Sequence, residues 1–430
     1  DLLKYSASHL FWSLVHSTTG FITSEKIDDL TNHVVLSAIS RTMSSDVLSG
    51  LESKYSDIHS GFCYDMIFNW IYGEDKKSFK NIADYVTSNL SLLDRFNSFE
   101  IKDLLETDVL PVIDEVILSK LMYSITNRTM DSDSIIRIVE KRRTSAWYED
   151  YTYFYEGIYQ VALMNQFYES HLNSFHHVEA KEMWNAYTSD YYQMDTFYRN
   201  FHTAFSTCLQ TLHPSLDDAF KDLADYVEKE YKNWYLDQLS SNWNKVIETD
   251  LGSTGKISGL AQQTDFYRDV VKNIDGKVFV IISDAMRYDV AHSLAKQLEI
   301  ETKADVEISA QQGIYPTITK YGMAALLPHK TLEVIENNGT TKVLVDGHSS
   351  EMSDRDGILK SYSENSVALR YKDIISMKRD DRRAAVKGKD IIYIYHDTID
   401  ASSHNDESSV FDACEKAINE IKNLVNVICN

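Results

Sequence analysis

The sequence predicts an N-terminal all-helical region followed by an α/β domain, in which a mostly parallel sheet is flanked by helices. Three observations support this fold class. Residues 1–250 show helical periodicity and almost no strand signal, and the glycine-containing stretch 250–262 then interrupts that periodicity. Further on, apolar runs of strand length alternate with helical segments, which is typical of a parallel sheet covered by helices. We therefore predict a helical region at 1–250, a linker at 251–274 and an α/β domain at 275–430.

The helical region contains its clearest pattern just after Pro214. Apolar side chains recur there at intervals of three or four residues and form one helical face: Leu216, Phe220, Leu223, Val227, Tyr231 and Trp234. Further helices are predicted near 2–16, 80–95, 99–107, 151–172 and 184–208. Aromatic residues are dense around 147–155. They could form a surface that stacks on bases, but wide packing between helices is the interpretation that we favour.

The α/β domain begins with the most distinctive strand. Five consecutive apolar residues, from Val278 to Ile282, leave no face for solvent, so we predict a strand buried on both faces of a parallel sheet. Strands are predicted at 277–283, 305–309, 342–346 and 391–395, and helices at 286–298, 319–327, 355–362 and 407–428.

Composition places the protein among globular proteins that carry a net negative charge. The 430 residues are 43% hydrophobic, which is enough for substantial cores. The formal charge of −22 is uneven, because residues 271–430 hold 20 basic and 25 acidic residues and the preceding residues hold 23 and 40. The first part is therefore a poor surface for non-specific DNA binding, whereas the second does not exclude a phosphate-bearing substrate.

The expected location is the cytoplasm. The four cysteines are widely spaced and form no CxxC pair, which favours a reducing compartment and argues against a cysteine-based zinc site. No stretch approaches the roughly 18 uncharged apolar residues of a spanning helix, so we expect no membrane association. Because the sequence begins at Asp1 without a methionine or a signal peptide, we expect an internal fragment of a longer protein.

Two residues at the start of the α/β domain are candidates for phosphoryl chemistry. Asp284 ends the first buried strand, at the sheet edge where α/β proteins bind ligands, and its carboxylate needs a cation or hydrogen-bond donors. It could also cap the following helix. Thr319 begins a predicted helix, where a threonine is usually a cap but could also be a nucleophile. Arg287 could pair with Asp284 or Asp289, or bind phosphate oxygens.

A second cluster follows the strand at 391–395. His396, Asp397, Asp400 and His404 offer oxygen and nitrogen ligands suited to Zn²⁺ or Mn²⁺. Asp400 and His404 lie four residues apart, so they could face one ion from a single helical turn; a polar loop is the alternative. The pair Asp346-Gly347 also ends a predicted strand, although Asp-Gly is ordinary turn chemistry.

A basic run lies shortly before the last of these strands. It comprises Lys378, Arg379, Arg382, Arg383, Lys387 and Lys389. It could contact a phosphodiester backbone, but a solvated helix face is the interpretation that we favour.

Several of these blocks together resemble the PglZ family. They are Ile282-Ser283-Asp284-Ala285-Met286-Arg287-Tyr288, Tyr315-Pro316-Thr317-Ile318-Thr319, Gly322-Met323-Ala324-Ala325-Leu326-Leu327-Pro328, Val345-Asp346-Gly347 and Tyr395-His396-Asp397-Thr398-Ile399-Asp400. The resemblance covers residues 275–430 closely and extends more weakly to the helical region. It implies an alkaline-phosphatase-like fold and a role in BREX and related phage-defence systems.

The resemblance also implies site residues. Asp284 and Thr319 would bind one metal, with Thr319 as the nucleophile, and Asp400 with His404 or His396 would bind a second metal. Zn²⁺ is the expected ion, with Mn²⁺ or Mg²⁺ as alternatives, and Arg287 would bind the substrate. The superfamily's Asp-His-Gly block is absent before Asn430, so we expect the fragment itself to be inactive.

Two functions of different class follow from this resemblance. The first is a metal-dependent phosphatase or phosphodiesterase, including a nuclease, within a bacterial phage-defence protein. The second is a phosphatase-like scaffold that binds other proteins of the defence complex without turnover. The expected partners are those proteins, together with nucleic acid bound through the α/β domain.

Overall fold

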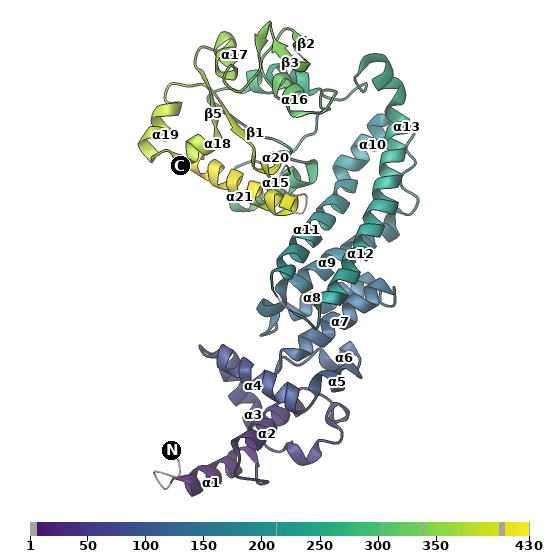
Figure 1. Cartoon of the computed structure of the whole chain (residues 1–430), viewed down its shortest axis with the longest axis vertical. Helices are drawn as coiled ribbons and strands as arrows, with labels where there is room; N and C mark the ends of the chain where they lie inside the picture. Colours follow the sequence, from purple (N-terminus) through teal and green to yellow (C-terminus); the bar gives the residue numbers. More distant parts are fainter. Residues whose placement is uncertain (1–6, 212, 303, 338, 404–408, 430) are drawn as a thin grey trace. The chain divides into compact units, whose positions relative to one another are not determined.

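The computed structural model describes residues 7–211, 213–302, 304–337, 339–403 and 409–429 (Figure 1). By packing, the chain divides into two compact units. The helical unit comprises residues 1–170 and 200–230, and the α/β unit comprises residues 171–199 and 231–430. The fold class predicted from the sequence is confirmed, whereas the domain boundary near residue 250 remains a prediction.

The helical unit is built from helices of one to six turns. They are α1 (Ser8–Thr19), α2 (Ile27–Ser40), α3 (Ser60–Ile71), α4 (Lys76–Asn89), α5 (Leu92–Asn97), α6 (Ile101–Leu104), α7 (Val112–Thr126), α8 (Ser132–Arg142), α9 (Tyr148–His171), the end of α11 (Tyr192–Leu209) and α12 (Asp217–Glu230). The stripe predicted for α12 is buried, since Phe220, Leu223 and Val227 are at most 1% exposed. Trp147 and Tyr155 are fully buried, as expected for packing between helices rather than for base stacking.

A buried ion pair fixes α7 against α8. The Arg142 guanidinium donates to both carboxylate oxygens of Asp114, over 2.9 Å from Nε and 2.7 Å from Nη2. It also donates to the Thr107 carbonyl over 2.8 Å, and the Tyr155 hydroxyl donates to Asp114. The two charges are completely removed from water yet fully hydrogen-bonded, which is the condition under which a buried pair is tolerated.

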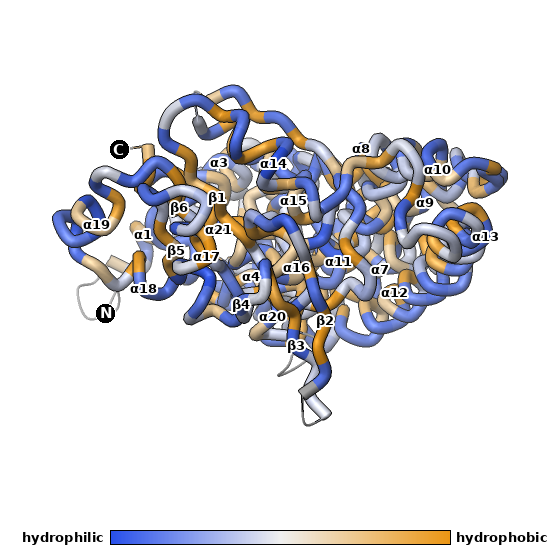
Figure 2. Tube along the Cα trace, turned by 90° about the horizontal axis from the view of Figure 1, so that it is seen from above, coloured by the Kyte–Doolittle hydropathy of each residue, from blue (hydrophilic) through white to orange (hydrophobic). Residues whose placement is uncertain are grey.

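The α/β unit contains a three-stranded parallel sheet. Its strands are β1 (Val278–Ser283), β6 (Ile391–His396) and β5 (Ser366–Arg370), in the order β1-β6-β5. Side chains alternate between its faces. Val280, Ile282 and Tyr395 pack on one face with α16 (Thr319–Ala325), α17 (Arg355–Tyr362) and β3 (Thr340–Val345), whereas Ile392 and Ile394 pack on the other with α18 (Tyr371–Ser376) and α21 (Val410–Cys429). The sheet is buried on both faces, as predicted, and its strands are predominantly hydrophobic in Figure 2.

A second, antiparallel sheet covers one side of this core. It comprises β2 (Leu332–Asn337), β3 and β4 (His348–Ser349), in that order. The strand predicted at 342–346 therefore belongs to a hairpin layer and not to the parallel sheet. The strand predicted at 305–309 was wrong: the alternation of apolar and charged residues there is typical of a strand, but among the described residues no neighbouring strand pairs with this segment, and Ile308 stays 39% exposed.

The remaining elements of the α/β unit are helical. They are α10 (Ala180–Ala186), the π-helices η3 (Tyr187–Tyr191) and η4 (Tyr231–Leu236), α13 (Asp237–Thr254), α14 (Phe266–Asp269), α15 (Tyr288–Glu301), α19 (Arg379–Val386) and α20 (Thr398–Ser403). The predicted linker is ordered: α13 ends within it, and Gln263 N donates to the Gln312 carbonyl over 2.9 Å. Within the described ranges, no helix is both long and apolar enough to cross a bilayer.

Candidate active site

The turn after β1 fixes the Asp284 carboxylate. The strand ends at Ser283, and Asp284 N then donates to the His396 carbonyl over 2.8 Å, which ties the residue to β6. The next residue, Ala285, has a φ of 60°, a left-handed conformation that is uncommon for a residue with a Cβ. The chain therefore turns sharply, and Asp284 Oδ1 accepts a hydrogen bond from Ala285 N over 3.0 Å.

Three predicted site residues line a single cavity of about 460 Å³ at the carboxyl edge of the parallel sheet. They are Asp284 after β1, Thr319 at the start of α16 and Asp400 in α20, which follows β6. Gln263 and Thr317 also line this cavity. Because β1 and β6 are parallel neighbours, the segments that leave their carboxyl ends reach the same edge. The cavity therefore gathers two carboxylates and a hydroxyl that lie far apart in the sequence.

Thr319 is not the helix cap that its position suggested. Ile318 occupies the cap position of α16, and no side-chain cap hydrogen bond forms there. Thr319 is exposed, and its hydroxyl acts to lower the pKa of the Asp284 carboxyl. Its oxygen is thus near a carboxylate and accessible from solvent, as a nucleophile requires.

The two carboxylates in the cavity affect one another. Burial and the nearby Asp400 carboxylate raise the pKa of Asp284 above its usual value, against smaller opposing effects of Ala285 N, the Thr319 hydroxyl and the Arg355 guanidinium. Like charges that share a partly dry site disfavour each other's ionised form. A cation placed between them would relieve this repulsion.

His396 does not face this cavity. Its ring is 1% exposed, with Nδ1 at 3.0 Å from Ser283 Oγ and Nε2 at 2.9 Å from Glu420 Oε2. Along β6, His396 alternates with Tyr395 and so shares the face of Ile394, toward α21. Both ring nitrogens are occupied there, so the structure separates His396 from Asp284 and Asp400.

The other predicted residues have different outcomes. His404 lies outside the described residues. Arg287 does not line the cavity; its Nε instead lies 3.2 Å from Asp289 Oδ1, and the same carboxylate accepts from Arg199 over 2.9 Å. The cation that influences Asp284 is Arg355, which the sequence did not indicate.

Arg355 is held at the start of α17. Its Nε donates to the Ser350 carbonyl over 3.0 Å, and its guanidinium lies 4.5 Å from the centroid of the Tyr395 ring. No motif surrounds Arg355, and only the spatial approach of α17 to the sheet brings its charge near Asp284. Sequence spacing alone could not have identified it.

Asp346 forms part of the turn between β3 and β4. Its φ of 49° and the φ of 81° at Gly347 allow a two-residue connection between β3 and β4. Its Oδ1 accepts from Lys330 N over 2.9 Å and from Thr331 N over 2.7 Å. Burial is the largest single effect and acts to raise its pKa, but the hydrogen bonds from Tyr362, Thr331 and Lys330 together outweigh it and lower the pKa to about 2. The turn interpretation of Asp-Gly is the one that the structure supports.

The donor set in the cavity fits part of a divalent metal site. Two carboxylates and a hydroxyl are hard oxygen ligands, and the mutual repulsion of the carboxylates favours a cation between them. Among the described residues, no group of three or more His, Cys, Asp or Glu side chains could hold a metal ion. Of the described residues that line the cavity, Asp284, Asp400 and Thr319 are the predicted site residues that could contribute to an ion bound there.

The parallel sheet, its flanking helices and the cavity at its carboxyl edge define an alkaline-phosphatase-like α/β domain. Residues 265–430 match the family model described as the BREX system PglZ alkaline phosphatase-like domain. This part of the chain therefore belongs to the PglZ family, as the sequence motifs predicted.

Two curated relatives extend the similarity to the helical unit. The whole chain aligns with "Alkaline phosphatase-like protein PglZ" of Bacillus cereus (strain H3081.97), with 32% identity over 438 residues. It aligns with "Alkaline phosphatase-like protein BrxZ" of Escherichia coli O9:H4 (strain HS) with 29% identity over 448 residues. The chain spans about half the length of each relative, 50% and 51%. No solved structure gives a significant match.

Proposed function

We propose that the α/β unit belongs to a metal-dependent phosphoester hydrolase in which Thr319 is the nucleophile. The observation that carries this proposal is the convergence of Asp284, Thr319 and Asp400 on one cavity at the carboxyl edge of the sheet. The influence of the Thr319 hydroxyl on the pKa of Asp284 supports it further, because it requires the two side chains to be close together.

In the proposed reaction, Thr319 Oγ1 forms a bond with phosphorus while the bond from phosphorus to the leaving alcohol breaks. The hydroxyl gives up its proton and the leaving alcohol takes one, so the step is balanced. A water molecule then hydrolyses the phospho-threonine and restores Thr319. A divalent cation bound by Asp284, Asp400 and Thr319 would lower the hydroxyl pKa and neutralise the phosphoryl charge. We propose Zn²⁺, with Mn²⁺ or Mg²⁺ as alternatives.

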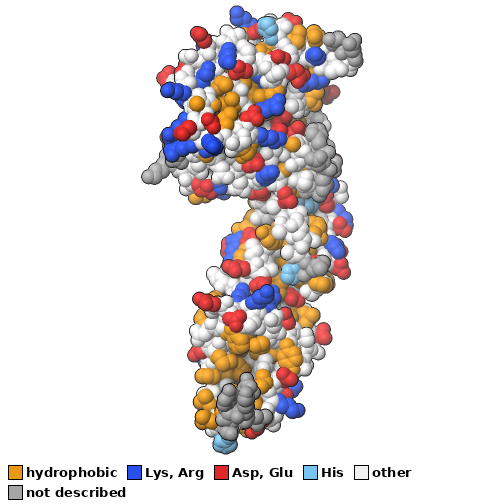
Figure 3. Space-filling view, turned by 60° about the vertical axis from the view of Figure 1, so that its left-hand side comes forward, with side chains coloured by type: hydrophobic (Ala, Val, Ile, Leu, Met, Phe, Trp, Pro, Cys, Tyr) orange, Lys and Arg blue, Asp and Glu red, His pale blue; other side chains and the backbone are white. Residues whose placement is uncertain are grey.

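We further propose that the protein acts in a cytoplasmic phage-defence complex, on the basis of its similarity to proteins named PglZ and BrxZ and to the BREX-system family model. A phosphodiester of nucleic acid is the substrate class that this context favours. Figure 3 shows Lys and Arg side chains mixed with Asp and Glu on the α/β unit. A nucleic acid on this face would therefore need several separate contacts rather than one continuous basic track.

A scaffold without turnover is the second candidate. The observation in its favour is that the described residues include no complete metal cluster and that His396 is committed to Glu420 and Ser283. In that case the cavity would be retained for its shape and the protein would bind the other proteins of the complex.

The deciding experiment compares Thr319→Ala with Thr317→Ala in a full-length protein that contains this chain. Both threonines line the cavity, but only Thr319 contacts Asp284. Hydrolysis of bis(p-nitrophenyl) phosphate and of p-nitrophenyl phosphate is measured with Zn²⁺, Mn²⁺ and Mg²⁺ in turn. Thr319→Ala should lower kcat by about a thousandfold or more, whereas Thr317→Ala should change it by less than about fivefold. The two substrates separate diesterase from monoesterase activity.

Retained activity in Thr319→Ala would falsify the nucleophile assignment. If the unmodified full-length protein hydrolyses neither substrate with any of the three metals, while Asp284→Asn and Thr319→Ala keep its binding to the defence-complex proteins, the scaffold function is the correct one.

A further inference from the structure

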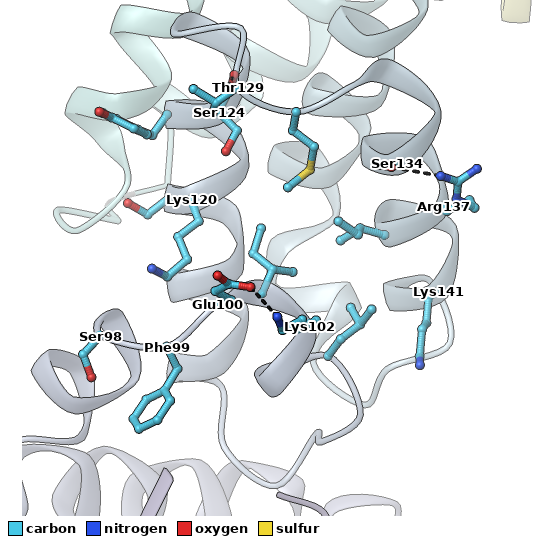
Figure 4. A pocket seen from close by; sticks show the side chains of 16 residues that line it. Ser98, Phe99, Glu100, Lys102, Lys120, Ser124, Thr129, Ser134, Arg137 and Lys141 are labelled. Carbon is cyan, nitrogen blue, oxygen red and sulfur yellow. Dashed lines mark hydrogen bonds and ion pairs between the residues drawn. The ribbon is translucent and has the colours of Figure 1, made fainter. Parts of the chain in front are cut away.

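A groove of the helical unit lies between α6, α7 and α8, and the proposed hydrolase reaction does not use it. Its volume is about 920 Å³ and it opens widely to solvent. Figure 4 shows Lys120 of α7 on one side of this groove, Arg137 and Lys141 of α8 on the other, and Lys102 between them. We call it the α7–α8 groove.

The floor of the α7–α8 groove is apolar. Phe99, Ile101, Leu105, Met130 and Ile138 line it, as does Tyr123, which is 67% exposed. Contiguous apolar surface that stays accessible commonly marks a binding site. A ligand that carried only phosphate groups would leave the apolar floor exposed to water.

The rim of the groove is basic. Four cations line it, Lys102, Lys120, Arg137 and Lys141, against the single carboxylate of Glu100. This is opposite in sign to the chain as a whole, whose formal charge is −22. An acidic ligand is therefore repelled by most of the protein and attracted here.

Among the described residues, two cations of the rim form no ion pair, and the other two form ion pairs whose side chains are exposed. The Lys120 ammonium donates to the Asn97 carbonyl over 2.8 Å, and Arg137 Nη2 donates to Ser134 Oγ over 2.9 Å. Neither has a carboxylate partner among the residues that the structure describes. Lys102 pairs with Glu100, and these side chains are 75% and 74% exposed; Lys141 pairs with Glu106, and these side chains are 41% and 67% exposed. Exposed pairs of this kind are weak and can be exchanged for an incoming carboxylate.

We propose that the α7–α8 groove binds an acidic amphipathic helix of a partner protein. Apolar side chains of that helix, spaced by three and four residues, would cover the floor, and its flanking Asp and Glu side chains would pair with Lys120 on one wall and Arg137 and Lys141 on the other. The combination of an apolar floor with a basic rim favours this ligand over nucleic acid, whose recognition by stacking would need several accessible aromatic rings.

The test selects ligands without assuming a sequence. A display library of random peptides of about 16 residues, long enough for a helix of four turns, is selected on the full chain. It is counter-selected on the Lys120→Glu/Arg137→Glu double variant. The expected result is enrichment of peptides with apolar residues at helical spacing and a net negative charge. The enriched peptides should lose about tenfold or more in affinity for the double variant in fluorescence anisotropy.

A matched control separates the groove from the charge of the whole protein. Lys26 and Lys54 are exposed, lie elsewhere in the helical unit and do not line the groove. Lys26→Glu/Lys54→Glu changes the net charge equally and should alter affinity by less than about twofold. Tyr123→Ala should weaken binding without any change of charge, which tests the apolar part of the site. Far-ultraviolet circular dichroism verifies that each variant is folded.

Three results would overturn the proposal. Selection could enrich no peptide whose binding depends on the groove residues, the enriched peptides could be basic or lack apolar periodicity, or both double variants could weaken binding equally. A labelled single-stranded oligonucleotide of about 20 nucleotides is tested in parallel. If it binds and Lys120→Glu/Arg137→Glu alone abolishes that binding, while no groove-dependent peptide is found, the groove is a nucleic-acid site.

Discussion

Replacing Arg142 by methionine should destabilise the helical unit strongly, because it leaves a buried carboxylate without its cation. Arg142 is 3% exposed and Asp114 is fully buried. Arg142 donates twice to Asp114, once to the Thr107 carbonyl and once to Ser145 Oγ. Removing one partner of such a pair typically costs about 3–5 kcal/mol in free energy of unfolding. After the substitution, Asp114 keeps only the hydrogen bond from the Tyr155 hydroxyl.

The neighbouring residue provides a matched control. Arg143 also makes a bidentate pair, with both bonds to Glu156 at 2.9 Å, but the two side chains are 36% and 31% exposed. Water screens this pair, so Arg143→Met should cost at most about 1 kcal/mol. The same chemical change at adjacent positions thus separates burial from the mere presence of an ion pair.

The cost of Arg142→Met should also depend on pH. Burial already raises the pKa of Asp114, and Arg142 opposes that effect, so its loss raises this pKa further. A carboxyl whose pKa is raised in the folded state binds more protons when folded, so its folded state loses stability as pH rises above the usual aspartate range. We therefore expect a smaller destabilisation at pH 5 than at pH 8.

Urea unfolding at both pH values measures these differences, and hydrogen exchange of the α7 and α8 amides localises them. The reasoning is refuted if Arg142→Met costs less than about 1 kcal/mol, or no more than Arg143→Met. A cost that increases toward low pH would refute the electrostatic explanation. Arg142→Met/Asp114→Leu should recover much of the loss, because it removes the unpaired charge.

Three further predictions concern the α/β unit. Zn²⁺ at a hundred times its Kd should stabilise the unmodified protein by about 2.7 kcal/mol. If Asp284 is a ligand, thermal melts should show that Asp284→Asn loses this stabilisation and that His396→Asn retains it. Equal shifts of the melting temperature in the two variants would contradict the assignment. Without metal, Asp284→Asn should raise stability by up to about 1 kcal/mol, because it removes the repulsion with Asp400. The depressed pKa of Asp346, about 2, means that its carboxylate stabilises the turn above the usual aspartate range and loses that effect as pH falls through about 2. Asp346→Asn should therefore cost at most about 1 kcal/mol at pH 7 and progressively less as pH falls through about 2, which thermal melts across that range would measure.

The sequence predicted those elements whose signal is local. The apolar run from Val278 to Ile282 indicated a buried strand, and the parallel pairing of β1 with β6 confirms it. The apolar stripe of α12 could be predicted equally well, because burial of one helical face requires apolar residues every three or four positions. The placement of Asp284 and Thr319 at one cavity also followed from local signals, a strand end and a helix start.

The features that the sequence did not predict depend on which strands pair and on which face of a strand a side chain lies. The short β5 has no strong pattern, and it forms a strand only because β6 offers it a partner. His396 was grouped with Asp400 because they are close in sequence, yet the alternation of β6 turns its ring toward Glu420. Arg142 and Arg355 acquire their roles from helices that approach distant segments. The spacing of residues along the sequence does not show which distant segments come together in space.

The two walls of the cavity belong to different layers of the α/β unit. Asp284 is anchored to β6 by its backbone, whereas Thr319 begins α16, whose Met323 packs beside Val343 and Val345 of the hairpin layer. Because α16 packs against the parallel sheet as well as against the hairpin layer, loosening of the hairpin removes one of the two supports of Thr319 and leaves the backbone anchor of Asp284 intact. Any ligand that contacts both side chains therefore restrains the two layers relative to each other. Occupancy of the cavity and rigidity of β2 and β3 should rise together, so slowed amide exchange in the hairpin becomes a remote sign that the cavity is filled.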